Sequence, residues 1–263
     1  YLNMQDAVII TGSAAGLGKA LSHTLSLKGT NVIGIDKNAD SDIIADLSTS
    51  NGRQIAIEKA LDICPKPKGV VANAGLSPIH HDPFEILEVN WLGVKEVLDS
   101  FLHPLSSNKS GSAVAISSIG AAVGGDKDLI DCLLEGRISD AKATLRTILQ
   151  SGIIEAGIIA YSSCKVAVAQ YVRANAKLWG NEGVRLNCIA PGRMQTDMLD
   201  GLLSHEDIAP GIEALPTGIA KSASASQVAD VVAFFLNEKS SFVHGQVLYV
   251  DGGSEALIRP HVI

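Results

Sequence analysis

The sequence predicts an α/β fold, a single domain built on a doubly wound parallel sheet. Three observations predict it. Short runs rich in Val, Ile and Ala alternate with longer segments of helical period. The short runs are apolar throughout, which is typical of parallel strands covered on both faces. A Gly-rich turn joins the first run to a helix, and right-handed crossovers between such strands produce a Rossmann-type sheet.

The individual elements follow from this alternation. We expect strands at Ala7–Thr11, Asn31–Asp36, Gly69–Ala72, Ser112–Ser117, Val184–Ile189 and Gln246–Val250. We expect helices at Gly16–Lys28, Arg53–Ile63, Phe84–Leu102, Tyr161–Trp179 and Ser226–Leu236. The composition, 46% hydrophobic and 19% charged, fits one large domain, which we place at residues 4–263.

One segment interrupts the alternation. The stretch between Ser118 and Tyr161 is longer than a strand-to-helix connection needs. It has helical character at Asp128–Leu134 and Ser139–Leu149, with Ser139 or Asp140 as a plausible cap. We therefore expect a helical insertion at about residues 121–158. It is either a surface elaboration without chemistry, or a substrate lid or an oligomer-shaping element.

Charge and cysteine content narrow the function classes. The formal net charge of −7, without a long basic run, argues against nucleic acid or an anionic membrane as the main partner. No apolar run approaches a membrane span, and Ala7–Ile10 is a strand and not a signal peptide. We expect no metal, a solvated loop at His80-His81-Asp82, and a cytoplasmic protein with four reduced, widely spaced cysteines: Cys64, Cys132, Cys164 and Cys188.

The first turn has the pattern of a dinucleotide-binding loop. The residues Thr11-Gly12-Ser13-Ala14-Ala15-Gly16-Leu17-Gly18 lie between a predicted strand and a predicted helix. Glycines bring the backbone close to a pyrophosphate, and the helix N-terminus offers unpaired N–H groups. We therefore expect a cofactor contact from each of Thr11, Gly12, Ala15, Gly16, Leu17 and Gly18.

The end of the second strand predicts the cofactor type. A carboxylate at Asp36 can accept hydrogen bonds from the adenosine ribose hydroxyls and repels a 2′-phosphate. This favours NAD over NADP, although Lys37 partly offsets the repulsion. Asp46-Leu47 follow the third strand, and Asp46 is either an adenine contact or a helix cap.

Later strand ends add further cofactor positions. Small residues in Asn73-Ala74-Gly75 allow the backbone to pack beside a cofactor ribose. Pro191-Gly192, with Thr196 beyond, can clamp the carboxamide and diphosphate.

The catalytic chemistry is expected around Tyr161 and Lys165, four residues apart at the opening of a helix and hence on one face. An ammonium and an oxidised nicotinamide both favour the phenolate, and a tyrosine pKa of about 10 must fall by about two to three units for it to act as a base. Ser117-Ser118 end the fifth strand, where a hydroxyl can hold the substrate oxygen. Asn90 is either a satisfied buried amide or a link to a water that relays a proton to Lys165.

Together these motifs resemble the short-chain dehydrogenase/reductase family. The resemblance rests on Thr11-Gly12-x-x-x-Gly16-x-Gly18, Asn73-Ala74-Gly75, Asn90, Ser118, Tyr161-x-x-x-Lys165 and Pro191-Gly192, in the family's order along the whole chain. It implies Tyr161 as general acid/base, Ser118 as the substrate-oxygen binder and Asn90 as the proton-relay residue. Lys165 is implied to bind the nicotinamide ribose and to lower the tyrosine pKa. Ser118 fits better than Ser117 because Ile119-Gly120 follow it.

A closer similarity is to the bacterial 3α-hydroxysteroid dehydrogenase/carbonyl reductase group. It rests on the long segment before Tyr161 and on Ile44–Thr49, Gly52-Arg53, Val243–Gly245, Asp251–Gly253 and Arg259-Pro260. A group similar to coniferyl-alcohol dehydrogenases shares the long segment. The resemblance implies a small apolar alcohol or ketone as substrate, which the apolar side chains of Leu199, Leu202, Leu203 and Ile208 also suggest.

The sequence also leaves two alternative functions to consider and suggests an oligomeric state. A 3-ketoacyl-type reductase would prefer NADP and carry a basic docking patch, and Asp36 speaks against the first. A non-catalytic dinucleotide sensor would lack one of the four catalytic residues. The family associates through the helices bearing Asn90 and Tyr161, and the insertion obstructs that face, so we expect a homo-oligomer, with a dimer favoured.

Overall fold

The computed structural model describes residues 6–108 and 110–262, so residues 4, 5, 109 and 263 of the predicted domain lie outside its description. Within that part, seven parallel strands form the central sheet in the order β3-β2-β1-β4-β5-β6-β9. They are β1 (Val8–Thr11), β2 (Val32–Asp36), β3 (Ile43–Ile44), β4 (Gly69–Ala72), β5 (Ser112–Ile116), β6 (Arg185–Pro191) and β9 (Val247–Val250). The strand order reverses beside β1, as in doubly wound sheets, so the predicted fold class is confirmed.

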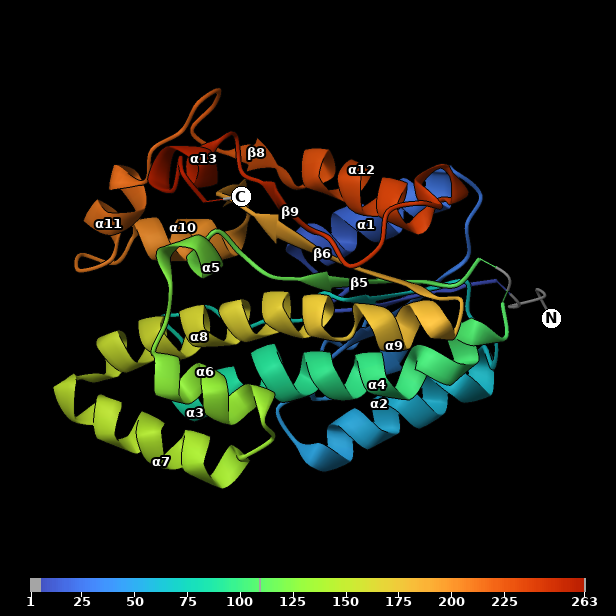
Figure 1. The fold of residues 1–263 in the computed structure, drawn as a ribbon, viewed down its shortest axis with the longest axis horizontal. Helices are drawn as coiled ribbons and strands as arrows, with labels where there is room; N and C mark the ends of the chain where they lie inside the picture. Colours follow the sequence, from blue (N-terminus) through green and yellow to red (C-terminus); the bar gives the residue numbers. More distant parts are fainter. Residues whose placement is uncertain (1–5, 109, 263) are drawn as a thin grey trace.

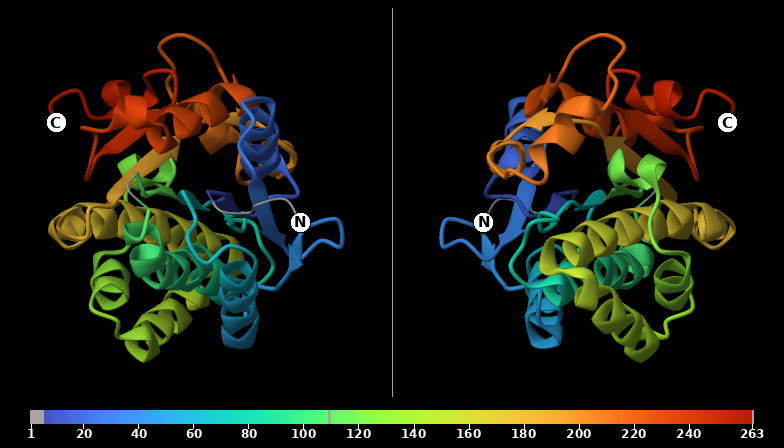
Figure 2. Two further views of the ribbon diagram at one scale, coloured as in Figure 1. Left: turned by 90° about the vertical axis from the view of Figure 1, so that its right-hand side faces the viewer. Right: turned by 90° about the vertical axis from the view of Figure 1, so that its left-hand side faces the viewer.

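Helices cover both faces of this sheet (Figures 1 and 2). One face carries α1 (Gly16–Leu27) and α12 (Ala225–Leu236), which pack on each other. The other carries α2 (Ser50–Ile63), α4 (Val94–Ser106) and α8 (Ile153–Ala174). Each face has its own apolar cluster, and strands β1 and β4 alternate between the two, with Ile9 and Val70 on one side and Ile10 and Val71 on the other. This explains the continuous apolar runs in the sequence.

Shorter elements complete the chain. They are α3 (Pro83–Leu87), α9 (Ala176–Asn181), α10 (Asp197–Leu203), α11 (Ala209–Ala214), α13 (Ser254–Ile258) and the 3-10 turn η3 (Glu238–Ser240), with β7 (Met194–Gln195) and β8 (Ala223–Ser224) forming a small second sheet. A π-helical turn, η1 (Glu88–Gly93), joins α3 to α4. The long helix predicted at Phe84–Leu102 is therefore three segments, and a strict 3.6-residue period could not reveal the wider π turn.

The insertion is helical, as predicted. It contains α5 (Gly120–Val123), α6 (Lys127–Leu134), α7 (Ile138–Ile148) and the 3-10 turn η2 (Leu149–Ser151), and its last residues form the first two turns of α8. Two expectations were wrong here. Tyr161 lies inside α8 and does not open it, because α8 begins at Ile153. Neither Ser139 nor Asp140 caps α7, whose N-cap position is Arg137.

Helix α8 is long and apolar enough to cross a membrane by length and composition, contrary to our expectation of no such stretch. However, 56% of its most apolar window is buried inside the protein. It packs on α3, α5 and α6 and on strands β5 and β6, which is the position of a core helix.

Candidate active site

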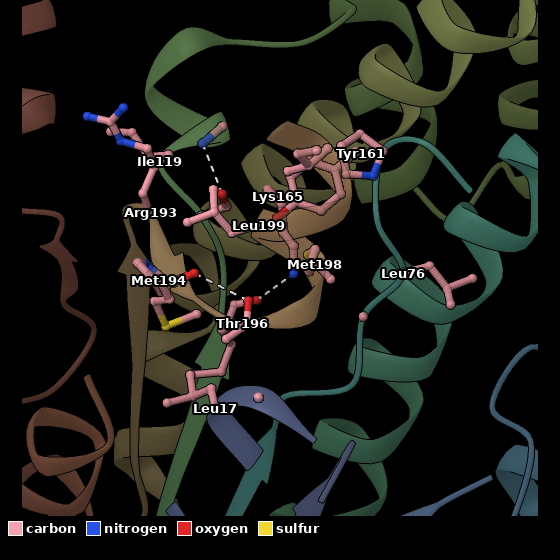
Figure 3. Close-up of a pocket in the computed structure, with 18 of the residues that line it drawn as sticks. Leu17, Leu76, Ile119, Tyr161, Lys165, Arg193, Met194, Thr196, Met198 and Leu199 are labelled. Carbon is pink, nitrogen blue, oxygen red and sulfur yellow. Dashed lines mark hydrogen bonds between the residues drawn. The ribbon is translucent and has the colours of Figure 1, made fainter. Parts of the chain in front are cut away.

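A cavity of about 600 Å³ opens at the carboxyl ends of the strands. Its walls come from the turn after β1, the ends of β2, β4, β5 and β6, helix α8, and the α10–α11 segment. Figure 3 labels Leu17 and Thr196 toward one end of this cavity and Tyr161 with Lys165 toward the other. One space therefore joins the predicted phosphate-binding turn to the predicted catalytic pair, as expected where ligands bind in open α/β sheets.

Lys165 is anchored deep in this cavity. Its side chain is only 4% exposed, and Nζ donates a hydrogen bond to the main-chain oxygen of Ile116 at 3.0 Å. Nζ also lies 5.6 Å from the ring centroid of Tyr161, so the spacing of four residues does bring the pair together. Burial lowers the pKa of Lys165 to about 8.

The pKa of Tyr161 differs from our expectation. We expected the Lys165 ammonium to lower it, but in the protein alone burial dominates and raises the pKa of the phenol. The hydroxyl of Ser118 opposes this by favouring the phenolate. In the protein alone the Tyr161 phenol is therefore neutral, and formation of the phenolate requires further positive charge in the cavity.

The two adjacent serines have different surroundings. Ser117 is buried, and its hydroxyl donates to the main-chain oxygen of Lys165 at 2.6 Å, which ties β5 to α8. Ser118 is less buried and its hydroxyl accepts a hydrogen bond from the Gly120 N–H at 3.1 Å. Both line the cavity, but only the Ser118 hydroxyl acts on Tyr161. This difference favours Ser118, as predicted, for holding a substrate oxygen.

Asn90 lies in the π turn η1 and is fully buried. Its Oδ1 accepts from the N–H of Leu76 at 2.6 Å, and its Nδ2 donates to the Leu76 carbonyl at 3.0 Å. A Cβ on Gly75 would lie 3.4 Å from Asn90 Oδ1 and 3.6 Å from Lys165 Nζ, so the glycine allows these groups to gather. The amide is satisfied by Leu76, and Asn90 is adjacent to Lys165 without lining the cavity.

The turn after β1 fits a dinucleotide pyrophosphate. Gly12 has a φ of +68°, and a Cβ on Gly18 would lie 2.0 Å from the Gly12 carbonyl oxygen, so a side chain is excluded there. Ala15 at the N-cap position of α1 offers no side-chain cap, and the first turn of α1 has no acidic residue. The N–H groups of this helix end are therefore available to an anion, and its dipole favours one.

The side chains of Thr11 and Asn73 hold this turn in place by hydrogen bonds. The hydroxyl of Thr11 accepts from the N–H groups of Asn73 and Ala74, both at 3.0 Å. The Asn73 amide donates to the carbonyls of Thr11 and Gly12 at 3.0 and 3.1 Å. Asn73 lines the cavity with Ala74 and Gly75, whereas Thr11 and Gly18 do not, so these two shape the turn.

Of the two acidic residues predicted for the adenosine end, only one lines the cavity. Asp36 lines the cavity, and its carboxylate accepts from the N–H groups of Ala14 and Asn38, both at 3.1 Å. Asp46 and Leu47 are not among the lining residues. Asp46 is exposed and accepts from the Ser48 N–H, which lowers its pKa. The helix-cap alternative for Asp46 is wrong, because Thr49 caps α2.

The residues after β6 close the cofactor end. Pro191, Gly192 and Thr196 line the cavity, and Thr196 lies close to Gly16 across it. Sequence reasoning missed Arg193, which lines the cavity and donates to the carbonyls of Ile212 and Leu215 at 2.9 and 3.1 Å. An isolated arginine after a strand carries no pattern that reveals such a contact.

The α10–α11 segment forms the apolar cover. Leu199, Leu202 and Ile208 line the cavity as expected, but Leu203 does not and is 40% exposed. Met198, Ile212 and Leu215 line it too. Of the insertion, only Val123 and Ile158 do, and Figure 1 shows α10–α11 above the sheet and α7 below it. Helices α10 and α11 therefore supply most of the apolar cover, and the insertion contributes Val123 and Ile158 to the cavity wall.

Histidine and cysteine side chains that could bind a metal or react lie outside the cavity lining. His80 and His81 have a partner that we overlooked, because their ligand atoms and that of Glu85 lie within 4.8 Å of one another. In this structure His80 Nε2 is 2.7 Å from Glu85 Oε2. Cys164 and Cys188 are buried, and burial raises the pKa of each thiol to about 12, which makes them unreactive packing residues.

Comparison with known proteins agrees with this geometry. A family model described as "short chain dehydrogenase" matches residues 6–128, and one described as "Enoyl-(Acyl carrier protein) reductase" matches residues 140–255. The chain is 36% identical to the 3-alpha-hydroxysteroid dehydrogenase/carbonyl reductase of Comamonas testosteroni, over 96% of this chain and 98% of that protein. It is 30% identical to the coniferyl-alcohol dehydrogenase of Pseudomonas sp. strain HR199, over 94% and 95%.

A solved structure also matches over the whole length. The 3-alpha-hydroxysteroid dehydrogenase from Pseudomonas sp. B-0831, complexed with NADH, superposes with a TM-score of 0.88 at 33% identity, covering 98% of this chain and 100% of that one. Sequence motifs, sheet order and these relatives agree. The chain therefore belongs to the short-chain dehydrogenase/reductase family of oxidoreductases.

Proposed function

We propose that the protein is an NAD-dependent dehydrogenase/reductase of secondary alcohols and ketones, and that its substrate is a 3α-hydroxysteroid or a similarly apolar carbonyl compound. One observation carries the proposal. A single cavity joins an anion-binding glycine turn to Tyr161, Ser118 and Lys165, under a cover of apolar side chains. Relatives named for 3-alpha-hydroxysteroids support the substrate class.

Each catalytic side chain has a role in this proposal. When bound, the nicotinamide supplies or accepts the hydride. For a ketone, Ser118 and Tyr161 hold the carbonyl oxygen by hydrogen bonds, and Tyr161 donates its phenolic proton to it. Lys165 binds the nicotinamide ribose and, with Asn90, returns a proton to Tyr161. The raised pKa of Tyr161 in the protein alone suits the donor role, and the positive charge of an oxidised cofactor favours the phenolate in the other direction.

We propose NAD as the preferred cofactor. Asp36 lines the cavity at the adenosine end, where its carboxylate suits ribose hydroxyls and repels a 2′-phosphate. The relative solved with NADH supports this preference. Gly12, Ala15, Gly16, Leu17, Pro191, Gly192 and Thr196 are proposed as direct contacts, with Thr11, Gly18 and Asn73 shaping the turn. Asp46 and Leu47 remain proposed adenine contacts, since the Ala45 N–H donates to the Asp36 carbonyl at 2.9 Å and places them beside Asp36.

We also propose a homodimer in the cytoplasm. Helices α6 and α7 of the insertion pack on α8 and α3, so they cover part of the face next to the Asn90 and Tyr161 helices. This supports a dimer through another surface, and light scattering of the purified protein tests it. All four cysteines are free and buried, which supports a reducing compartment.

A coniferyl-alcohol-type substrate is the second candidate, favoured by the 30% identical relative. A 3-ketoacyl-type reductase would prefer NADP, which Asp36 disfavours, and a dinucleotide sensor would not need the full set of Tyr161, Ser118, Lys165 and Asn90. The deciding experiment follows NADH absorbance with purified protein, NAD and a panel of 3α-hydroxysteroids, aromatic alcohols and simple secondary alcohols.

Tyr161→Phe should abolish this turnover and leave NADH binding nearly unchanged. Tyr171→Phe is the matched control, because Tyr171 lies on the same helix but its hydroxyl bonds to Asp99 outside the cavity. Turnover by Tyr161→Phe would overturn the mechanism. NADH binding without turnover of any alcohol or ketone would favour the sensor, and turnover of aromatic alcohols alone would favour the second candidate.

A further inference from the structure

A charge network around one buried arginine links the insertion to the loop that follows β3. Its centre is Arg53 on α2, which is only 3% exposed. The Arg53 guanidinium donates to Glu96 Oε2 at 2.8 Å, to Glu88 Oε2 at 3.0 Å and to the main-chain oxygen of Leu47 at 3.0 Å. An arginine this buried is stable only when its donors are paired, so its partners are held in place as much as it is.

Glu88 extends the network to the insertion. One of its oxygens accepts from Arg53 and the other from Lys142 of α7, at 2.6 Å. The Glu88 side chain is 18% exposed and that of Lys142 is 34% exposed. Two cations thus face two carboxylates, and removing Lys142 leaves Arg53 between Glu88 and Glu96 with an excess negative charge. A second contact fixes α7 at the same place, with Arg146 5.7 Å from the ring centroid of Phe84 on α3.

The two ends of this network reach the loop after β3 and the π turn that carries Asn90. The Leu47 carbonyl belongs to the loop that begins beside Asp36, where the Ala45 N–H donates to the Asp36 carbonyl. Glu88 begins the π turn that carries Asn90 two residues later. A shift of Arg53 would therefore disturb two contacts together, the one with the Leu47 carbonyl and the one with Glu88 in the π turn.

We propose that Lys142 is a positioning residue for cofactor binding, which acts through Glu88 and Arg53 to hold the Asp46-Leu47 loop against the adenosine half of the dinucleotide. The insertion then supports the adenosine end of the site through the contacts Lys142–Glu88 and Arg53–Leu47. This inference rests on the proposed function for the identity of the cofactor, but its test does not depend on catalysis.

The test measures the affinity of the full-length protein for NADH and for ADP-ribose, which lacks nicotinamide, by titration calorimetry. Lys142→Met should weaken both ligands about threefold, the size typical of a partly exposed charge partner. Glu88→Gln, which removes the negative charge that both cations share and leaves a single acceptor oxygen, should weaken them about tenfold. In the Glu88→Gln background, Lys142→Met should have no further effect, because the coupling runs through that carboxylate.

Two further variants separate positioning from general damage. Lys142→Arg should restore both affinities. Lys127→Met is the matched control, because Lys127 is an exposed insertion lysine whose ion pair within the described residues is with Asp131 on its own helix, and it should change neither affinity. In steady state, Lys142→Met should raise the KM for NAD and leave the KM for the alcohol unchanged.

Several outcomes would overturn the inference. They are unchanged ADP-ribose affinity in Lys142→Met, additive losses in the double variant, equal losses in Lys127→Met, or no rescue by arginine. Loss of ADP-ribose affinity in a protein that oxidises no alcohol would uphold the inference and overturn the proposed function. A wild-type protein that binds neither NADH nor ADP-ribose would overturn both.

Discussion

Ser117 and Ser118 are neighbours, and exchanging each for alanine should produce opposite results. Ser117 is buried and donates its hydroxyl hydrogen bond to the Lys165 carbonyl at 2.6 Å. Losing a buried hydrogen bond of this kind costs about 1 kcal/mol of unfolding free energy. For a domain of this size that lowers the melting temperature by about 2–4 °C. Turnover should fall by less than about tenfold, because Lys165 keeps its bond to Ile116.

Ser118→Ala should lower turnover strongly and change the stability little. Its hydroxyl accepts from the Gly120 N–H and favours the Tyr161 phenolate, both at the cavity wall, so the melting temperature should change little. Removing a donor that stabilises the developing charge on a substrate oxygen costs about 10²–10³ in kcat. The assay compares thermal melts followed by circular dichroism with NADH absorbance at saturating NAD.

The result that refutes this reasoning is equally specific. If Ser117→Ala loses as much turnover as Ser118→Ala with an unchanged melting temperature, the two serines have been assigned the wrong way round. If Ser118→Ala retains full turnover, no hydroxyl at this strand end holds the substrate oxygen.

Three further predictions follow from single positions. Because burial lowers the pKa of Lys165 to about 8, below its ordinary 10.5, the unfolded chain binds more protons between these values. The unfolding free energy of the cofactor-free protein should therefore gain a contribution that rises from pH 8 to 10.5, and Lys165→Met should lack it in denaturant titrations. Gly18→Ala should abolish NADH binding by fluorescence titration, since its Cβ would meet the Gly12 carbonyl at 2.0 Å, whereas Gly201→Ala, with a 3.8 Å contact to Ile79, should bind normally. Asp36→Ser should raise the ratio of kcat/KM for NADP over NAD by at least about tenfold, and an unchanged ratio would show that Asp36 does not select the cofactor.

Most of the sheet and of the cavity lining could be predicted from the sequence, because both depend on local patterns. Apolar runs place the strands, and the glycines of Gly12–Gly18 carry their conformational requirement in their identity. Tyr161 and Lys165 share a helix face through their spacing alone, and the ends of neighbouring parallel strands meet at one edge. These features bring Ser118, Asn73 and Pro191 together without knowledge of any side-chain contact.

The remaining features depend on contacts between distant segments. No periodicity shows the π turn at Asn90, the early start of α8 at Ile153, or the pairing of His80 with Glu85. The direction of the Tyr161 pKa was wrong because spacing indicates a nearby charge but not the degree of burial, and here burial dominates.

By itself, then, the sequence determined the fold class, the family motifs and which proposed catalytic side chains share one edge of the sheet. Only the tertiary structure decided that the Ser117 hydroxyl bonds to the Lys165 carbonyl, that α10–α11 supplies most of the apolar cover, and that Lys142 reaches Arg53 through Glu88. The physical reason is that strand and turn preferences act between neighbours along the chain, whereas burial and long-range charge pairing depend on which segments fold against one another.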